Sequence, residues 1–352
     1  MQHSIHLFER LPQIEARPAT VNDGAFPPVR SKPLVGLIRN GRSYHNGGGS
    51  PVEGPSHNAA VSHGALGEVI VTAPQERSDL VEILADFAAR RVDCIAIDGG
   101  DGTVRDVLSC GAGIFGESWP TLIVLPHGKT NALALDLGIP VDWTLEQALA
   151  AIQNGKIERR QPLVITQKDN SGAQVRGFIM GAGIFNRCIA LGQRSHDFGA
   201  FNAAVVGLTT AWSVLQAFFG SGNNPWRRGT RMRLRTGEGK EVEHLGGLPA
   251  DERYLLFAST LKKFPAGLNP FRGLDKTVRV ALLDNPGRGL LLRIGALMRG
   301  TASAATRRRG GHVFDGEALD LELSGRFILD GESFPAGHYR LNAGAKLRFV
   351  VP

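Results

Sequence analysis

The chain has 352 residues, of which 42% are hydrophobic and 21% charged, so it is long enough for one large folded domain or two smaller ones. Its formal net charge of +7 predicts an anionic partner. Basic and aromatic residues are not interleaved and no zinc-ligand spacing occurs, which argues against nucleic acid and favours an anionic membrane surface.

Residues 1–32 contain Pro, Asn and Gly without clear periodicity, and we expect a loosely ordered leader there. No apolar stretch near Met1 is typical of a signal peptide. The three cysteines, at positions 94, 110 and 188, are few and far apart in apolar patterns. We therefore expect reduced thiols in a cytoplasmic protein.

Residues 33–156 alternate between strand-like and helix-like patterns. A first strand is predicted over 33–40, a long glycine-rich loop follows to about residue 67, and a strand over 69–72 precedes a helix over 77–91. This alternation predicts an α/β domain, with a mostly parallel sheet flanked by helices.

The glycine-rich turn after residue 97 lies between a short buried strand, residues 92–97, and a predicted helix with apolar residues at 104, 107 and 108. A strand that enters a helix through glycines points several backbone N–H groups at one spot, where they can hold an anion such as a phosphate. The residues of this turn are Gly99, Gly100, Asp101, Gly102 and Thr103. Its single acid, Asp101, would stand where phosphate chemistry needs magnesium or a reacting hydroxyl.

A second strand–turn–helix unit follows, with a strand over 121–125, a turn over 126–131 and a short helix that ends near Gly138. We expect both turns at the carboxyl edge of neighbouring parallel strands, where ligands sit in open α/β sheets.

Residues 157–352 predict a β-rich, largely antiparallel domain. The expected strands are 157–166, 175–180, 230–235, 254–259, 278–283, 319–323, 326–329 and 346–351. Two helical runs interrupt them. The run within 198–226 is expected to pack its apolar face on a sheet or, alternatively, in a membrane interface. The run over 287–298 has arginines around it and is expected to be a solvated face or a site for docking to anionic lipid.

Three motifs together resemble one family. The GGDGT stretch at 99–103 and the pattern P-x-G-x-x-N-x-x-A, which begins at Pro126 and is followed by LGIP, are similar to the catalytic domain of the diacylglycerol kinase superfamily, which includes sphingosine and ceramide kinases. A D-G-E segment at 330–332 matches the family's terminal motif. Lys129, Thr130 and Ala132 depart from the usual Thr, Gly and Asp of the second motif.

The resemblance implies an ATP-dependent lipid kinase that binds ATP and Mg²⁺ between the two domains. The residues expected to contact the nucleotide are Asn40, Gly99, Gly100, Asp101, Gly102, Thr103, Gly128, Lys129, Thr130 and Asn131. By the resemblance, Glu332 is the general base and Asp330 holds magnesium or a water network, while Asp101 can exchange duties with either. A D-G pair is also typical of an ordinary hairpin turn, and Lys129 can equally be a solvated surface lysine.

The expected acceptor is a primary hydroxyl of a neutral membrane lipid. Residues 131–134, Asn-Ala-Leu-Ala, favour ceramide or a sphingoid base, with diacylglycerol close behind. The expected location is the cytoplasm, peripherally associated with the inner face of the membrane. Two other classes stay open: an NAD kinase-like enzyme, which also uses GGDGT between similar domains, and a catalytically inactive nucleotide-binding protein.

Overall fold

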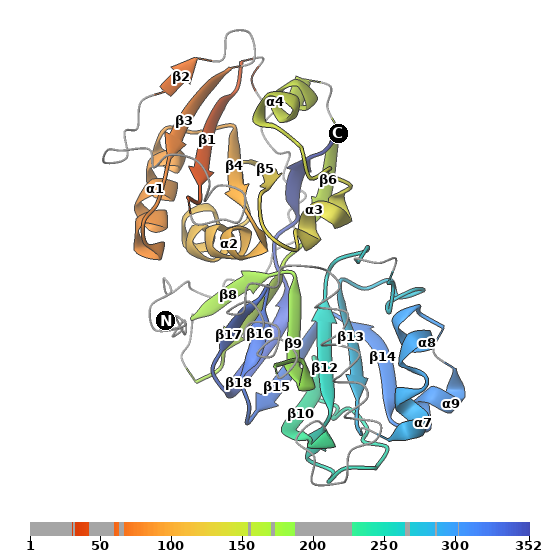
Figure 1. Ribbon diagram of the computed structural model, residues 1–352. Helices are drawn as coiled ribbons and strands as arrows, with labels where there is room; N and C mark the ends of the chain where they lie inside the picture. Colours follow the sequence, from red (N-terminus) through yellow and green to blue (C-terminus); the bar gives the residue numbers. More distant parts are fainter. Residues whose placement is uncertain are drawn as a thin grey trace, which may run out of the picture.

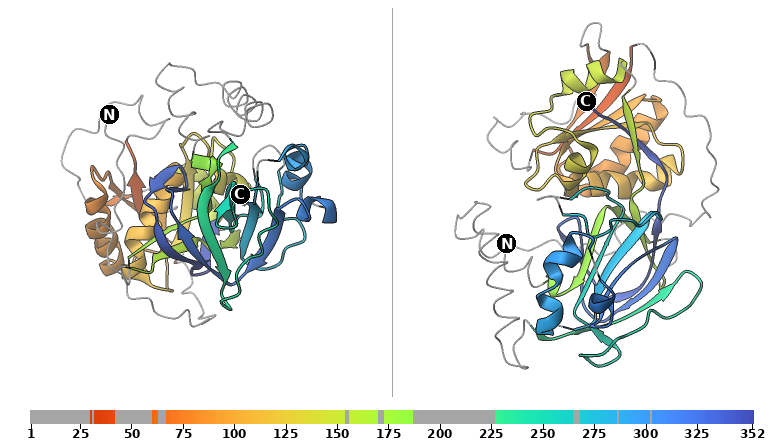
Figure 2. Two further views of the ribbon diagram at one scale, coloured as in Figure 1. Left: turned by 90° about the horizontal axis from the view of Figure 1, so that it is seen from below. Right: turned by 90° about the vertical axis from the view of Figure 1, so that its right-hand side faces the viewer.

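The computed structural model describes residues 30, 32–41, 60–62, 67–153, 156–169, 173–186, 227–264, 268–285, 287–301 and 303–352. Nearly all of the predicted leader, most of the loop after Asn40, Cys188 and the helical run within 198–226 lie outside these residues. Two domains are stacked one above the other, as Figure 1 and the right-hand view of Figure 2 show.

The first domain is built on a seven-stranded sheet in the order β2-β3-β1-β4-β5-β19-β6. The strands from β3 to β19 pair in parallel, and β2 and β6 close the two edges in antiparallel fashion. Their bounds are β1 Leu34–Arg39, β2 Ala60–Ser62, β3 Glu68–Thr72, β4 Cys94–Gly99, β5 Thr121–Pro126, β6 Ile157–Arg160 and β19 Leu347–Val350. The central strands β4 and β5 are buried along their whole length, as expected for a sheet covered on both faces.

Four helices belong to this domain: α1 Arg77–Ala89, α2 Asp101–Phe115, α3 Ala132–Leu137 and α4 Leu145–Gln153. Helix α1 begins with a capping box between Glu76 and Asp79 and buries Leu80, Leu84 and Phe87. The Phe87 ring packs where a Cβ on Gly36 would stand, so glycine in β1 lets α1 approach the sheet closely.

The second domain is a sandwich of two six-stranded antiparallel sheets. One sheet contains β11 Glu252–Arg253, β10 Thr230–Thr236, β15 Ala318–Leu323, β18 Gly337–Ala343, β7 Leu163–Gln167 and β8 Gln174–Gly177. The other contains β14 Gly311–Gly316, β13 Val278–Leu283, β12 Leu255–Ser259, β9 Ile179–Gly183, β16 Phe327–Leu329 and β17 Glu332–Phe334. Aliphatic and aromatic side chains of both sheets form one buried core, with Phe327 edge-on to Tyr339 at 5.0 Å between ring centroids. The short helices α7 Arg288–Leu291, α8 Ile294–Met298 and α9 Ala304–Arg307 lie beside β14.

The predicted fold class is confirmed, but the predicted boundary at residue 156 needs correction. Strand β6 and the C-terminal strand β19 both belong to the first sheet, so the chain crosses into the sandwich after Arg160 and returns at Leu347. The expected strand over 157–166 is two strands in different sheets. Pro162 lies between them, where it cannot donate to a ladder.

Within the described residues, no helix is long and apolar enough to cross a bilayer. Cys94 and Cys110 are buried free thiols, and burial raises the pKa of each to about 12. These two therefore have the inert, reduced character expected from the sequence.

The return of the C-terminus predicts that the last strand stabilises the first domain. Phe349 is fully buried in β19 and its ring lies edge-on to Phe178, between β8 and β9, at 6.5 Å. Phe349→Ala should lower the free energy of unfolding by about 3–5 kcal/mol, because it leaves a cavity where the two domains meet. Chemical denaturation measures this. Val351→Ala, just beyond the strand, is the control, and an equal loss in both variants would contradict the assignment.

Candidate functional site

The two glycine turns touch at the carboxyl edge of the first sheet. Strands β4 and β5 pair in parallel, with Gly99 opposite Pro126, so each strand delivers its turn to the same edge. A Cβ on Gly100 would lie 2.8 Å from the Cα of Gly128, and a Cβ on Gly128 only 2.4 Å from the Cα of Gly100. Only glycine at both positions allows this backbone contact.

The Asn131 side chain holds the second turn in shape. Asn131 is left-handed, with φ of 50°, and its Oδ1 accepts the N–H of Gly128 at 2.9 Å. Its Nδ2 donates to the carbonyls of Pro126 and Gly128, each at 2.9 Å. These bonds give Asn131 a role in building the turn that the sequence did not indicate.

The Asp101 side chain joins the two turns. Its Oδ2 accepts the N–H of Ala132 at 2.9 Å and its Oδ1 accepts that of Leu133 at 3.1 Å, so the acid of the first turn caps helix α3 after the second. Burial raises the pKa of this carboxyl, and the two backbone bonds oppose that shift.

Asn40, which follows β1, is the third part of the site at this edge of the sheet. Asn40 donates its backbone N–H to the carbonyl of Asp98 and its Nδ2 to Oγ1 of Thr103, both at 2.9 Å. A Cβ on Gly99 would lie 2.4 Å from that same Thr103 oxygen, so glycine is needed there as well. The structure thus brings the predicted residues of β1, β4 and α2 together.

The N-terminus of α2 is open to an anion. This helix has 15 residues, and no side chain caps it at Gly100. The first turn of a helix has N–H groups without helical acceptors, and they carry partial positive charge. A Cβ on Gly102 would meet nothing closer than the Arg105 side chain at 3.7 Å, and Lys129 and Thr130 are exposed on the adjoining turn. The arrangement suits a phosphate.

The predicted D-G-E segment forms the hairpin turn between β16 and β17. Asp330 and Gly331 both have positive φ, of 44° and 83°, and Leu329 pairs with Glu332, which is the geometry of a two-residue hairpin. The Asp330 carboxylate accepts the N–H groups of Phe178 and Ile179, each at 2.9 Å. Burial, and next repulsion from Asp101, raise the pKa of Asp330 to about 7.

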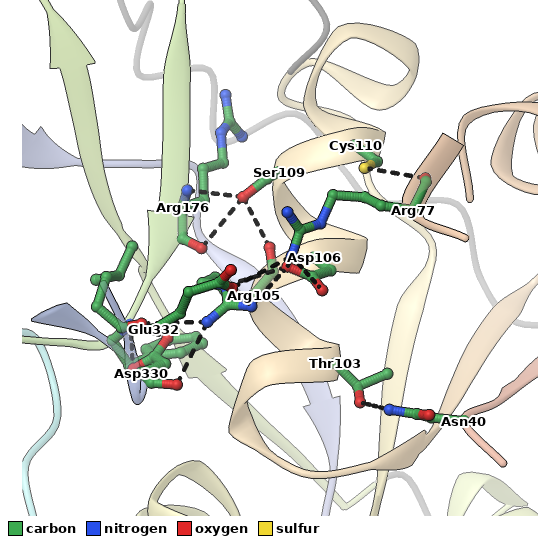
Figure 3. Close-up of polar contacts among 12 residues, drawn as sticks. Asn40, Arg77, Thr103, Arg105, Asp106, Ser109, Cys110, Arg176, Asp330 and Glu332 are labelled. Atoms are coloured by element: carbon green, nitrogen blue, oxygen red, sulfur yellow. Dashed lines mark hydrogen bonds and ion pairs between the residues drawn. The ribbon is translucent and has the colours of Figure 1, made fainter. Parts of the chain in front are cut away.

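The Glu332 side chain, which belongs to the sandwich, contacts residues of the first domain, as Figure 3 shows. Its carboxylate pairs with the guanidinium of Arg105 on α2 and with Arg77 at the start of α1, the latter at 3.2 Å. Asp106 binds both arginines, at 2.8 Å to Arg77 and 2.9 Å to Arg105. These four charges are largely buried and connect the hairpin of the sandwich to two helices of the first domain.

The sequence reasoning missed this network. Arg105 is only 4% exposed and also donates to the carbonyl of Leu329 at 3.2 Å. One turn later, the Ser109 Oγ accepts the N–H of Arg176 in β8 at 2.9 Å. The available signal was an Arg-Asp pair one residue after GGDGT, on a helix whose neighbouring positions are apolar.

A second missed group lies at the sheet edge. Asp98 is the last residue but one of the buried strand β4 and is 3% exposed. Its carboxylate contacts Nδ1 of His127, in the second turn, at 2.5 Å, and Nε of Arg39, at the end of β1, at 3.1 Å. An acid near the end of an apolar strand, beside glycines, was the signal, and it places a histidine next to Gly128.

Two of the described carboxylates, those of Asp101 and Asp330, are the candidates for binding magnesium. Asp101 and Asp330 are close enough for the charge of one to raise the pKa of the other. In the part of the chain that the structure describes, no three His, Cys, Asp or Glu residues are grouped as a metal site. Magnesium commonly takes one or two carboxylates and fills its shell from phosphates and water, so two acids fit such an ion bound together with a nucleotide. A cavity of about 560 Å³ in the sandwich, beside α9, contains none of the predicted site residues.

The fold and this edge define a two-domain protein in which an α/β domain with two adjoining glycine turns is joined to a β-sandwich. Residues 45–163 match the family model described as the diacylglycerol kinase catalytic domain. The predicted resemblance to that superfamily is therefore confirmed.

The relatives agree with this placement. Over 75 residues the chain is 32% identical to a "Probable lipid kinase YegS-like" of Cronobacter sakazakii, and this alignment covers 21% of the chain and only 25% of that relative. A solved structure of "a putative diacylglycerol kinase" from Bacillus anthracis aligns with a TM-score of 0.60 at 16% identity, covering 92% of this chain and 97% of that one. Another diacylglycerol kinase structure from that organism gives a TM-score of 0.57 at 15% identity, with the same coverage. At these identities the structures show a shared fold.

The contact between the turns predicts unequal effects of two glycine substitutions. Gly100→Ala should lower the free energy of unfolding by about 1–3 kcal/mol, because its Cβ forces the turns apart. Gly102→Ala should leave it unchanged or slightly raised, because its Cβ makes ordinary contacts within a helix. Denaturant titration compares the two, and equal stabilities would contradict the close approach.

The buried Asp330 predicts a pH dependence of stability. Its pKa is raised in the folded state, so the native protein holds the proton more tightly than the unfolded chain, and stability falls as pH rises through about 7. Relative to Asp330→Asn, the wild type should lose on the order of a few kcal/mol of unfolding free energy between about pH 5 and pH 8. Asp142→Asn, at an exposed position of the first domain, is the control and should keep the slope of the wild type. If the unfolding free energies of wild type and Asp330→Asn changed equally with pH, the buried position of Asp330 would be contradicted.

Proposed function

We propose that the protein is an ATP-dependent lipid kinase, which transfers the γ-phosphate to a primary hydroxyl of a neutral lipid. One observation carries the proposal: helix α2 offers an open N-terminus at Gly100 and, on its next turn, binds the hairpin that contains Glu332. The proposed phosphate cradle is therefore part of α2, and the candidate base is bound to the same helix through Arg105. The family match and the curated lipid kinase relative support the same reaction class.

In this proposal the triphosphate binds the N–H groups of the first turn, residues 99–103, and of the adjoining turn at Gly128 and Thr130. Lys129 is exposed beside them and adds a positive charge. Asn40 and Asn131 act by holding Thr103 and the second turn in position. Phosphoryl transfer depends mainly on such positioning and electrostatic stabilisation.

Asp101 and Asp330 are the proposed magnesium ligands, and Glu332 is the proposed general base. A bound magnesium ion would neutralise charge on the phosphates. Asp101 has a further task, because its bonds to Ala132 and Leu133 fix the distance between the two turns. Arg77 and Arg105 hold Glu332 against α2, so its carboxylate has a fixed position relative to the cradle.

The proposed acceptor is ceramide or a sphingoid base, with diacylglycerol as the alternative, and residues 131–134 carry this preference. We place the protein in the cytoplasm, at the inner face of the membrane, where such lipids are accessible. Labelled ATP with each of the three lipids in mixed micelles, and with NAD as a soluble acceptor, tests the class. Phosphate transfer to NAD alone would favour an NAD kinase-like enzyme. ATP binding without transfer would favour an inactive nucleotide-binding protein.

The roles of the acids predict two different losses. Glu332→Gln should lower kcat by about 10²-fold or more while calorimetry still detects ATP binding, because Glu332 lies outside the glycine turns. Asp101→Ala should abolish turnover and also weaken ATP binding, because the turns lose their link. Glu322→Gln, on the exposed side of β15, is the control. Full activity in both site variants would show that the acids are misassigned.

A further inference from the structure

The segment between Asp284 and Asp315 contains an unusual accumulation of positive charge. It holds six arginines and no lysine, aspartate or glutamate, so it supplies a formal charge of +6 out of the +7 of the whole chain. The arginines are at positions 288, 293, 299, 307, 308 and 309. This charge is therefore concentrated on one element group, α7 to α9, rather than spread over the surface.

The three helices form one surface at the edge of the sandwich, beside β14 (Figures 1 and 2). Leu290, Leu291 and Leu297 point inward and pack on a small buried cluster. A Cβ on Gly289 in α7 would lie 3.0 Å from the guanidinium of Arg309, which follows α9, so the outer sides of these helices are adjacent.

This surface also presents an apolar side chain to solvent. Leu292, at the end of α7, is 72% exposed, although Leu290 and Leu291 just before it are buried. Five of the arginines are exposed, and Arg293 is half-buried. We name Leu292 together with these six arginines the basic–apolar patch.

Four arginines of the patch, at positions 293, 299, 307 and 308, form no ion pair with an acid in the described part of the chain. Arg293 and Arg299 donate to backbone carbonyls of their own helices, at 2.8 and 2.9 Å, which leaves most of each guanidinium available. The buried acid Asp284, which precedes this segment in the chain, is bound by Arg253 and His312. Arg307 and Arg308 have no carboxylate partner among the described residues.

We propose that the basic–apolar patch docks the protein on an anionic lipid bilayer, with Leu292 inserted among the lipid headgroups. Basic residues near such a surface and an apolar side chain that reaches the acyl boundary are the two components of interfacial binding. Nucleic acid fits less well, because residues 285–313 contain no Phe, Tyr or Trp for bases to stack on. The proposal rests on the proposed lipid kinase function only in that such an enzyme has a reason to bind a membrane, since docking itself requires no catalysis.

Flotation with vesicles tests the proposal. Wild type should bind vesicles of phosphatidylcholine with added phosphatidylserine, bind phosphatidylcholine alone far more weakly, and be released by salt. Leu292→Asp should weaken binding about 10-fold or more, from the lost burial of one leucine side chain. Arg307→Glu with Arg308→Glu should weaken it about 25-fold or more, at about fivefold for each arginine.

Val141→Asp is the matched control, because Val141 is 75% exposed and lies in the other domain, outside the patch. It should bind vesicles like wild type. Circular dichroism should show native folding for every variant, since the substituted side chains are exposed. Equal binding to neutral and anionic vesicles, or equal binding by all variants, would overturn the proposal. Binding to duplex DNA lost in the arginine variant, without vesicle binding, would overturn it as well.

Activity in detergent micelles separates this proposal from the proposed function. Micelles deliver lipid without a charged bilayer, so Leu292→Asp should transfer phosphate there at the wild-type rate while failing on vesicles. Absence of transfer by wild type in micelles would contradict the kinase function and leave the vesicle result to stand on its own. Loss of activity by Leu292→Asp in micelles would contradict a docking role for this residue.

Discussion

The bond from Asp101 to the N–H groups of Ala132 and Leu133 holds the candidate site together. It joins the first turn of α2 to the start of α3, while Gly100 and Gly128 touch between them. Parallel pairing of β4 and β5 brings both turns to one edge of the sheet, and the Asp101 bonds fix how the turns lie against each other. The N–H groups of two strand–turn–helix units thus lie together, as the binding of a polyanion requires.

Helix α2 connects the glycine turns to the second domain. Its N-terminus lies at the glycine turns, Arg105 holds the 329–332 hairpin, and Ser109 binds β8. The chain also crosses between the domains twice, since β19 returns to the first sheet. A buried charge network costs solvation energy unless it is well paired, and here Glu332 and Asp106 share two arginines. These contacts therefore hold the two domains in a defined relative position, as a reaction between a nucleotide and a second substrate requires.

The sequence predicted what local patterns encode. Buried strands, glycine turns and the alternation of the first domain were visible because apolar period and turn residues are properties of neighbouring residues. Strand partners are not local. The pairing of β19 with β5 brings Phe349 beside Leu122, and the split of 157–166 between two sheets follows from partners in β19 and β18, all of them distant in the chain. Strands β14 and β18 escaped prediction because each mixes polar residues and glycine with few apolar ones.

In the candidate site, too, local patterns were predictable and long-range contacts were not. The sequence located Asp101 and Asp330, but their side chains bind backbone groups of other segments, which no spacing rule reveals, whereas Asn131 bonds within its own turn. The arginines that hold Glu332 were missed, because Arg77 lies 255 residues away in the chain. Motifs thus identified where the chemistry is concentrated, whereas long-range hydrogen bonds and ion pairs determine which residue contacts which.

The claim on which the account depends is that the joined turns bind the phosphates of a nucleotide. Titration of ¹⁵N-labelled protein with ATP and Mg²⁺ tests it directly, because each backbone amide reports its own environment. The account predicts saturable shifts that are largest for the N–H groups of Gly100, Asp101, Gly102 and Gly128. Unchanged resonances at these four positions, with shifts elsewhere or none at all, would contradict it.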